Sequence, residues 1–249
     1  MPTSLERHDP VGVIVEPPAG GDRFVAGAAL SVVLVLLAIQ VLARELIPPL
    51  AIFAVLYLAA AAVLAVRRAR WLLVTVGLLA LVHLAGSVPF FVANLAHPES
   101  PASFITEALI ALTATVTLVS AVTGLRGGWS GARRPVAVAA AVLAVLAIAI
   151  SLIASLGVEG DALQDGDVPV ESVRSTFPER VELAAGTSVL WVDNQDPFHH
   201  TLVIDGTDVH EVLPGSTSVR VGVDLAPGTY TFLCDVPGHE AMQGVLDVR

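Results

Sequence analysis

The stretch of sequence that decides the fold lies near the C-terminus, at residues Tyr230–Gly244, which read YTFLCDVPGHEAMQG. Its first part is rich in aromatic and β-branched residues and predicts a β-strand that ends at Cys234. A loop with His239 and Met242 follows, and the apolar residues after Gly244 predict the next strand. The two strand ends and the loop between them therefore bring Cys234, His239 and Met242 close together.

These three side chains are of the kinds that bind copper. A mononuclear blue-copper site has two imidazoles and one thiolate in a plane, with a weak thioether on the axis. The second imidazole must come from a distant strand, and the adjacent His199 and His200 offer it. Because side chains alternate across a strand, His200 shares a face with the apolar Leu202 and Ile204. This favours His200 as the ligand and predicts that His199 is an exposed polar neighbour.

Two segments resemble the cupredoxin family, which includes plastocyanin-like and azurin-like copper proteins. The first is residues 181–201, VELAAGTSVLWVDNQDPFHHT, and the second is the loop quoted above. The resemblance covers residues 168–249 and implies a Greek-key β-sandwich that holds one copper ion. The copper ligands that it implies are His200, Cys234, His239 and Met242. It also implies that Thr201 helps to hold the ligand loop, and Asn194 and His199 are further candidates around the site.

The residues beside Cys234 argue against a copper enzyme. Multicopper oxidases and nitrite reductases resemble this fold but place His next to the Cys, where this chain has Leu233 and Asp235. A binuclear copper site needs two cysteines, and Cys234 is the only one in the chain. We therefore predict an electron carrier rather than an enzyme, with His239 as the edge through which electrons pass. Redox partners would dock briefly on a small apolar patch around that edge, formed by Pro237, Gly238 and Ala241.

The composition indicates a membrane domain ahead of the copper-binding region. The chain is 55% hydrophobic and only 14% charged, whereas soluble proteins carry about 25% charged residues. Apolar runs of roughly 20 residues can cross a bilayer as helices. We predict an all-α polytopic domain of about five helices at residues 24–156, and we expect Pro89 to kink the third helix. The predicted spans are Phe24–Ala43, Leu46–Val66, Trp71–Ala93, Phe104–Leu125 and Val136–Leu156.

The placement of arginine predicts the orientation, because cytoplasmic loops carry an excess of positive charge. Two connections between spans are rich in arginine, with Arg67, Arg68 and Arg70 in one and Arg126, Arg133 and Arg134 in the other. The N-terminus is therefore predicted to be cytoplasmic, and five crossings of the cell membrane place the copper domain on the extracytoplasmic side. Arg44 is the one exception, because this arrangement places it on the extracytoplasmic side.

The remaining segments complete the predicted domain organisation. Residues 1–23 are polar, contain several prolines and glycines, and are predicted to form a flexible cytoplasmic tail. Residues 157–167 are acidic and rich in glycine, so we predict a linker that gives the next domain some reach. Eight short strands are predicted at residues 168–249, as in a β-sandwich.

The charge of the C-terminal part bears on its partners. From Glu159 onward the chain has 16 acidic residues and four arginines. This acidic surplus excludes nucleic acid as a partner. It suits either the docking of a basic redox partner or simple solubility.

Two ionisable residues lie inside the predicted spans, His83 in the third and Glu107 in the fourth. They would serve a quinone pocket or a proton path, or form ordinary interhelical hydrogen bonds. We expect a type 1 copper protein, anchored in the lipid bilayer, that passes single electrons to redox partner proteins such as an integral membrane redox complex. Two alternatives stay open. One is copper capture, delivery or sensing, and the other is a helical domain that acts as an enzyme or transporter fed with electrons by the copper domain.

Overall fold

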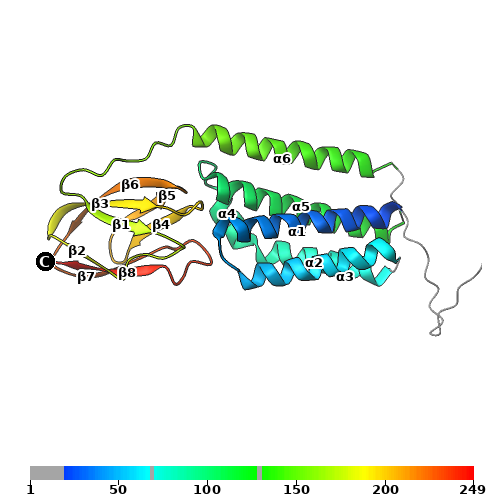
Figure 1. The fold of residues 1–249 in the computed structure, drawn as a ribbon, viewed down its shortest axis with the longest axis horizontal. Coiled ribbons are helices and arrows are strands. Elements are labelled where there is room, and N and C mark those ends of the chain that lie inside the picture. Colours follow the sequence, from blue (N-terminus) through cyan, green and yellow to red (C-terminus); the bar gives the residue numbers. More distant parts are fainter. Residues whose placement is uncertain (1–19, 68–69, 128–130) are drawn as a thin grey trace, which may run out of the picture.

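The protein consists of a helical bundle and a β-sandwich that follow one another along the long axis of the molecule (Figure 1). The computed structural model describes residues 20–67, 70–127 and 131–249. The predicted tail at residues 1–23 lies mostly outside these residues, and the first helix begins at Gly20. The prediction of an N-terminal helical domain followed by a sheet-rich domain is confirmed.

Six helices form the bundle within the described residues. They are α1 (Gly20–Ala43), α2 (Pro48–Val66), α3 (Arg70–Gly86), α4 (Val88–Leu95), α5 (Pro101–Leu125) and α6 (Arg133–Ser155). Four of them, α1, α2, α5 and α6, are long and apolar enough to cross a membrane. The pair α3 and α4 would make a fifth span if it crosses as one unit. The predicted count of about five spans is therefore confirmed as four or five.

The predicted third span is broken into two helices. Helices α3 and α4 meet at Ser87 and are bent by 52°. Pro89 stands in the first turn of α4, where its missing N–H costs no helical hydrogen bond. A proline therefore starts a new helix here rather than only kinking an old one.

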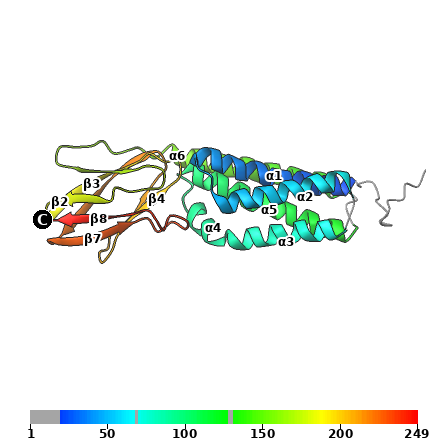
Figure 2. The same ribbon diagram turned by 60° about the horizontal axis from the view of Figure 1, so that its bottom comes forward.

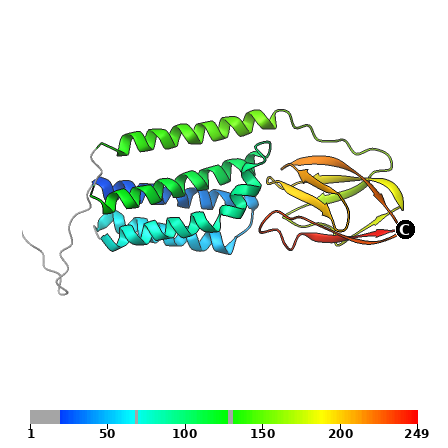
Figure 3. The ribbon, with the colours of Figure 1, turned by 180° about the vertical axis from the view of Figure 1, so that it is seen from behind.

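Helix α6 lies at the edge of the bundle and packs against α5 (Figure 3). In the turned view of Figure 2 it lies behind α1. Within α6 only Ser151 is buried, and its hydroxyl donates a hydrogen bond of 2.6 Å to the carbonyl oxygen of Pro98. Apart from Arg133 and Arg134 at its start and Ser155 at its end, the rest of α6 is apolar and largely exposed. Such a helix is stable in lipid, which solvates apolar side chains on all sides.

Eight strands form the two sheets of the sandwich, close to the predicted positions. They are β1 (Val168–Ser172), β2 (Arg180–Leu183), β3 (Gly186–Asn194), β4 (His200–Ile204), β5 (His210–Leu213), β6 (Thr217–Leu225), β7 (Gly228–Leu233) and β8 (Gln243–Val248). One sheet has the order β1-β3-β6 and the other has the order β2-β8-β7-β4-β5. Strands β4, β7 and β8 are neighbours, so the chain segments that carry the predicted ligands meet at one end of one sheet.

The linker at residues 157–167 is fastened to the sandwich along its second half. The backbone carbonyl of Asp161 accepts hydrogen bonds from Trp191 Nε1 at 2.7 Å and from the Ser218 hydroxyl at 2.8 Å. The guanidinium of Arg220 donates two hydrogen bonds of 2.8 Å to the carboxylate of Asp167. The composition predicts a flexible linker over residues 157–167, but only residues 157–160 lie ahead of the point where it is attached to the sandwich.

Gly244 offers a test of how tightly the ligand-bearing sheet packs. A Cβ at this position would collide with the Pro178 carbonyl oxygen and with the Phe232 ring, whereas a Cβ at Gly222 would meet nothing within 4 Å. We expect Gly244→Ala to destabilise the sandwich by about 1–3 kcal/mol, since the backbone must shift. Gly222→Ala is the control and should stay within about 0.5 kcal/mol. Urea unfolding of the full chain in detergent, followed by Trp191 fluorescence in a background where Trp71 and Trp129 are replaced by Phe, measures both. Equal midpoints would contradict the packing described here.

Candidate metal centre

Three predicted ligands converge at the end of the sandwich that faces the bundle. Nδ1 of His200 lies 3.1 Å from Nδ1 of His239, and the Cys234 Sγ lies 3.9 and 3.6 Å from these two nitrogen atoms. Among the described residues, this is the one group of three or more His, Cys, Asp or Glu side chains whose donor atoms all lie within 4.8 Å of one another. A single ion can therefore contact all three.

The ligand loop is a short turn whose backbone is tied to the strand before it. The Cys234 N–H donates to the Met242 carbonyl at 2.9 Å, and the Met242 N–H donates to the His239 carbonyl at 2.8 Å. Cys234, His200 and Met242 are buried, while His239 is half-buried. Met242 belongs to the same apolar core as Cys234, so its side chain is packed inside the sandwich. Its role as the axial ligand stays a prediction.

Thr201 holds the sulfur and the ligand loop together. Its backbone N–H points at the Cys234 Sγ at 3.4 Å, and its hydroxyl lies 3.6 Å from the same atom. The hydroxyl also lies 2.7 Å from Asp235 Oδ1 and accepts a hydrogen bond of 2.9 Å from the Asp235 N–H. Thr201, which follows His200, thus positions Asp235, which follows Cys234.

Asp196 orients the first histidine and was not found from the sequence. Its Oδ2 lies 2.9 Å from Nε2 of His200, which leaves Nδ1 facing Cys234 and His239. The backbone N–H groups of Arg174 and Ser175 donate to the same carboxylate at 2.7 and 2.8 Å. Metal-binding imidazoles commonly have such a carboxylate on their second nitrogen. The available signal was an acidic residue in the loop that enters the His200 strand.

Asn194 braces the loop that carries Asp196. It is buried, and its side-chain amide contacts three backbone carbonyls, those of Phe198, Leu213 and Pro214, at 2.9–3.1 Å. Gly215 allows the loop to come close, because a Cβ there would collide with the Pro197 carbonyl oxygen. Both residues keep the first histidine in place without touching it.

The electrostatics of the site favour a charged sulfur. Burial disfavours the thiolate, but contacts with His200, His239 and Thr201 outweigh it and lower the pKa of Cys234 to about 5. Burial also acts to lower the pKa of His200, yet its bonds to Asp196 and Cys234 raise that pKa above its usual value. A thiolate is the form of cysteine that binds a metal.

This donor set fits copper. A thiolate and two imidazoles within one small triangle, with a buried thioether nearby, match the soft ligands and trigonal arrangement of a mononuclear copper site. The carboxylate on His200 supplies the outer hydrogen bond that such ligands need.

The comparison with protein families agrees with this site. Residues 140–248 match the family described as "Cupredoxin-like domain". The C-terminal domain is a cupredoxin domain. The match begins inside α6, before the linker, so it extends beyond the sandwich itself. Copper is the cofactor of this domain, since the family and the donor set both indicate it.

Several solved structures are similar to the cupredoxin domain. Auracyanin B is 20% identical over 37% of this chain and 95% of its own, with a TM-score of 0.31. A reduced mutant of amicyanin is 15% identical over 35% of this chain and 86% of its own, with a TM-score of 0.30. A copper-containing nitrite reductase from Thermus scotoductus is 25% identical over 37% of this chain and 24% of its own, with a TM-score of 0.28. No curated protein matches the chain.

The prediction that His199 is exposed is wrong. Its exposed fraction is 2%, because the copper-binding end of the cupredoxin domain lies against the helical bundle. The His199 N–H donates to the Ser103 hydroxyl at 3.0 Å, and Phe198 packs against the apolar core of the bundle. In the ligand loop, Gly238 lies beside the ring of Phe90 in α4. The strand pattern around His199 carries no information about this second domain.

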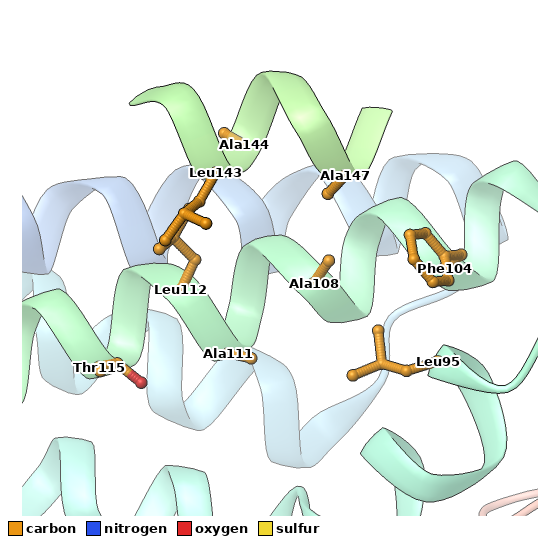
Figure 4. A pocket seen from close by; sticks show the side chains of 9 residues that line it. All are labelled: Leu95, Phe104, Ala108, Ala111, Leu112, Thr115, Leu143, Ala144 and Ala147. Carbon is orange, nitrogen blue, oxygen red and sulfur yellow. The ribbon is translucent and has the colours of Figure 1, made fainter. Parts of the chain in front are cut away.

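The two ionisable residues of the spans have separate partners. Nδ1 of His83 lies 3.5 Å from the Tyr57 hydroxyl, which links α3 to α2. The Asn94 amide donates to the Glu107 carboxylate at 3.1 Å and links α4 to α5. Both contacts join neighbouring helices, while His83 Nε2 and Glu107 Oε1 are buried without a hydrogen-bond partner among the described residues, so a quinone pocket or proton path stays a prediction. A groove between α5 and α6 is lined by apolar side chains and Thr115, and none of these could bind a metal (Figure 4).

The role of Asp196 can be tested by removing its charge. We expect Asp196→Asn to weaken copper binding by about 10- to 100-fold, since the imidazole of His200 loses the carboxylate that orients it. Asp193→Asn is the matched control, because Asp193 bonds to Gln195 instead. Competition with a chromophoric copper chelator measures both affinities. Equal losses in the two variants would show that Asp196 does not position the ligand.

Proposed function

We propose that this chain is a membrane-anchored type 1 copper protein that transfers single electrons on the extracytoplasmic side. The observation that carries the proposal is the convergence of His200, Cys234 and His239 at a buried end of the cupredoxin domain. Copper held there would supply one-electron chemistry between its monovalent and divalent forms. His200, Cys234 and His239 would be its equatorial ligands, and Met242 the axial one.

Hydrogen bonds from the surrounding residues hold the ligands in place. Asp196 fixes His200, Thr201 fixes the sulfur of Cys234, and the hydrogen bonds of the loop fix His239. A site whose donors are already in place needs little rearrangement when the charge of the ion changes. Small rearrangement favours rapid electron transfer over substrate chemistry, and we infer an electron carrier rather than an enzyme.

The half-buried His239 gives electrons a route to a partner protein. Gly238 before it and Glu240 and Ala241 after it are exposed, and Gly238 lies close enough to Phe90 of the helical bundle that an added Cβ would touch the ring. The bundle thus borders the apolar patch beside Gly238 and leaves the patch accessible. A partner would use a small interface there, as transient redox encounters do.

The orientation follows from arginine placement together with the helices. If α3 and α4 cross as one bent span, the bundle crosses the membrane five times. The connections that hold Arg67 and Arg70, and Arg126 and Arg133, then lie on the cytoplasmic side. The cupredoxin domain lies at the opposite end of the bundle (Figure 1). Residues around the copper site would therefore meet partners at the outer membrane surface.

The ligand assignment predicts a spectrum. The full-length protein in lipid nanodiscs, loaded with Cu(II), should show an intense blue thiolate-to-copper band and a narrow copper hyperfine splitting. Cys234→Ser removes the only thiol of the chain and should abolish the band. Met242→Leu should keep the band and change the reduction potential, as expected of an axial ligand. A colourless wild-type protein with a tetragonal copper signal would rule out the electron-transfer proposal.

The orientation predicts where reporter enzymes work. Alkaline phosphatase, which folds only outside the cytoplasm, should be active when fused after Arg249 and inactive when inserted in the connection between α5 and α6. Green fluorescent protein at the same two positions should give the opposite pattern. If phosphatase is active only in the α5–α6 connection, the proposed topology is inverted.

A further inference from the structure

A second pair of imidazoles stands beside the copper centre, at the contact between the two domains. The rings of His97 and His199 have centroids 5.0 Å apart and planes 43° apart. The copper-binding pair, His200 and His239, has almost the same arrangement, with 4.7 Å and 55°. His97 comes from the connection between α4 and α5, and His199 comes from the cupredoxin domain.

The imidazole of His199 is buried with one nitrogen unpaired. Its exposed fraction is 2%, and within the described part of the chain Nδ1 has no hydrogen-bond partner. The Ser103 hydroxyl accepts the backbone N–H of His199, so it fixes the residue without satisfying the ring. A buried polar nitrogen without a partner is costly and indicates a group that the protein chain does not itself supply.

His97 has the hydrogen bond that a metal-binding imidazole usually needs. Its Nδ1 lies 2.9 Å from the Glu99 carboxylate, which leaves Nε2 as the donor for a ligand. The Asp196–His200 pair of the copper centre is built in the same way, with the carboxylate on one nitrogen and the metal side on the other. The side chains of His97 and Glu99 are 27% and 28% exposed, so an ion can reach this pair from solvent.

We propose that His97 and His199 form a second copper-binding site that takes the monovalent ion. Imidazole nitrogens suit copper, and a monovalent ion is stable with few donors. Its single positive charge is balanced by the adjacent Glu99 carboxylate, whereas a divalent ion would leave net charge in a partly buried site. The inference rests on the proposed function in one respect, which is that copper is the ion present at this end of the domain.

The site joins the two domains, because each contributes one ligand. Copper bound there stabilises the arrangement in which the cupredoxin domain rests on the bundle, since an ion that binds only the docked form favours that form. His199 also precedes His200 directly in the chain. The second site is therefore placed to hold a copper ion next to the electron-transfer centre, either before the centre is filled or as a link that keeps the domains together.

The experiment counts copper ions bound by the full-length protein in nanodiscs. Apo protein is titrated with Cu(I) under anaerobic reducing conditions against a chromophoric chelator. We expect the wild type to bind about two ions per chain, with the second weaker than the first. His97→Phe keeps an aromatic ring at the contact but has no nitrogen, and it should bind about one. Glu99→Gln should weaken the second ion by about 10- to 100-fold.

Each variant is then oxidised and its blue band is recorded, which reports on the first centre alone. One ion per chain in the blue wild type would overturn the second site and leave the electron-transfer proposal standing. Two ions in His97→Phe would also overturn it. A colourless wild type that loses one of two ions in His97→Phe would support the second site and refute the electron-transfer proposal. A blue His97→Phe protein shows that the variant has folded.

Discussion

The register between β4 and β7 is the constraint on which the copper centre depends. The two strands pair through Val203 with Leu233 and Ile204 with Phe232. This pairing places the start of β4, at His200, beside the end of β7, next to Cys234. A slip of one residue would turn every side chain to the opposite face. His200 would then leave the site, and His199 would enter it without the carboxylate of Asp196. The apolar core below, with Leu202, Ile204 and Phe232 fully buried, opposes such a slip.

Contact with the helical bundle gives the copper-binding end of the domain a second boundary. Burial of His199 and packing of Phe198 on the bundle core mean that both loops carrying ligands meet, or lie close to, the end of the helices that faces the cupredoxin domain. Water and soluble partners can therefore approach the ligands at His239 and the exposed residues after it, where the bundle does not cover the domain. In an isolated cupredoxin domain the same surface would be open on all sides. The helices thus shape access to the metal as well as anchoring the domain.

Much of this arrangement could be predicted from the sequence, because strands and spans depend on local patterns. Alternation selected His200, and the strand–loop–strand pattern placed Cys234 and His239 together. Other features depend on distant parts of the chain. His199 is buried by a domain that precedes it by nearly a hundred residues, and Asp196 gains its role only when its loop folds back onto His200. The break at Ser87 was visible only as a proline near the end of a long apolar run.

The fastening of Asp161 to β3 and β6 limits how far the cupredoxin domain can move if it leaves the bundle. Only residues 157–160 connect the end of α6 to this fastened point, and four extended residues span roughly 14 Å. The cupredoxin domain is therefore connected to the bundle by a short linker with little reach. The domain can tilt away from the helices and return, but the linker does not let it reach far from the bundle. Redox partners of the proposed electron carrier would therefore dock close to the end of its helical bundle.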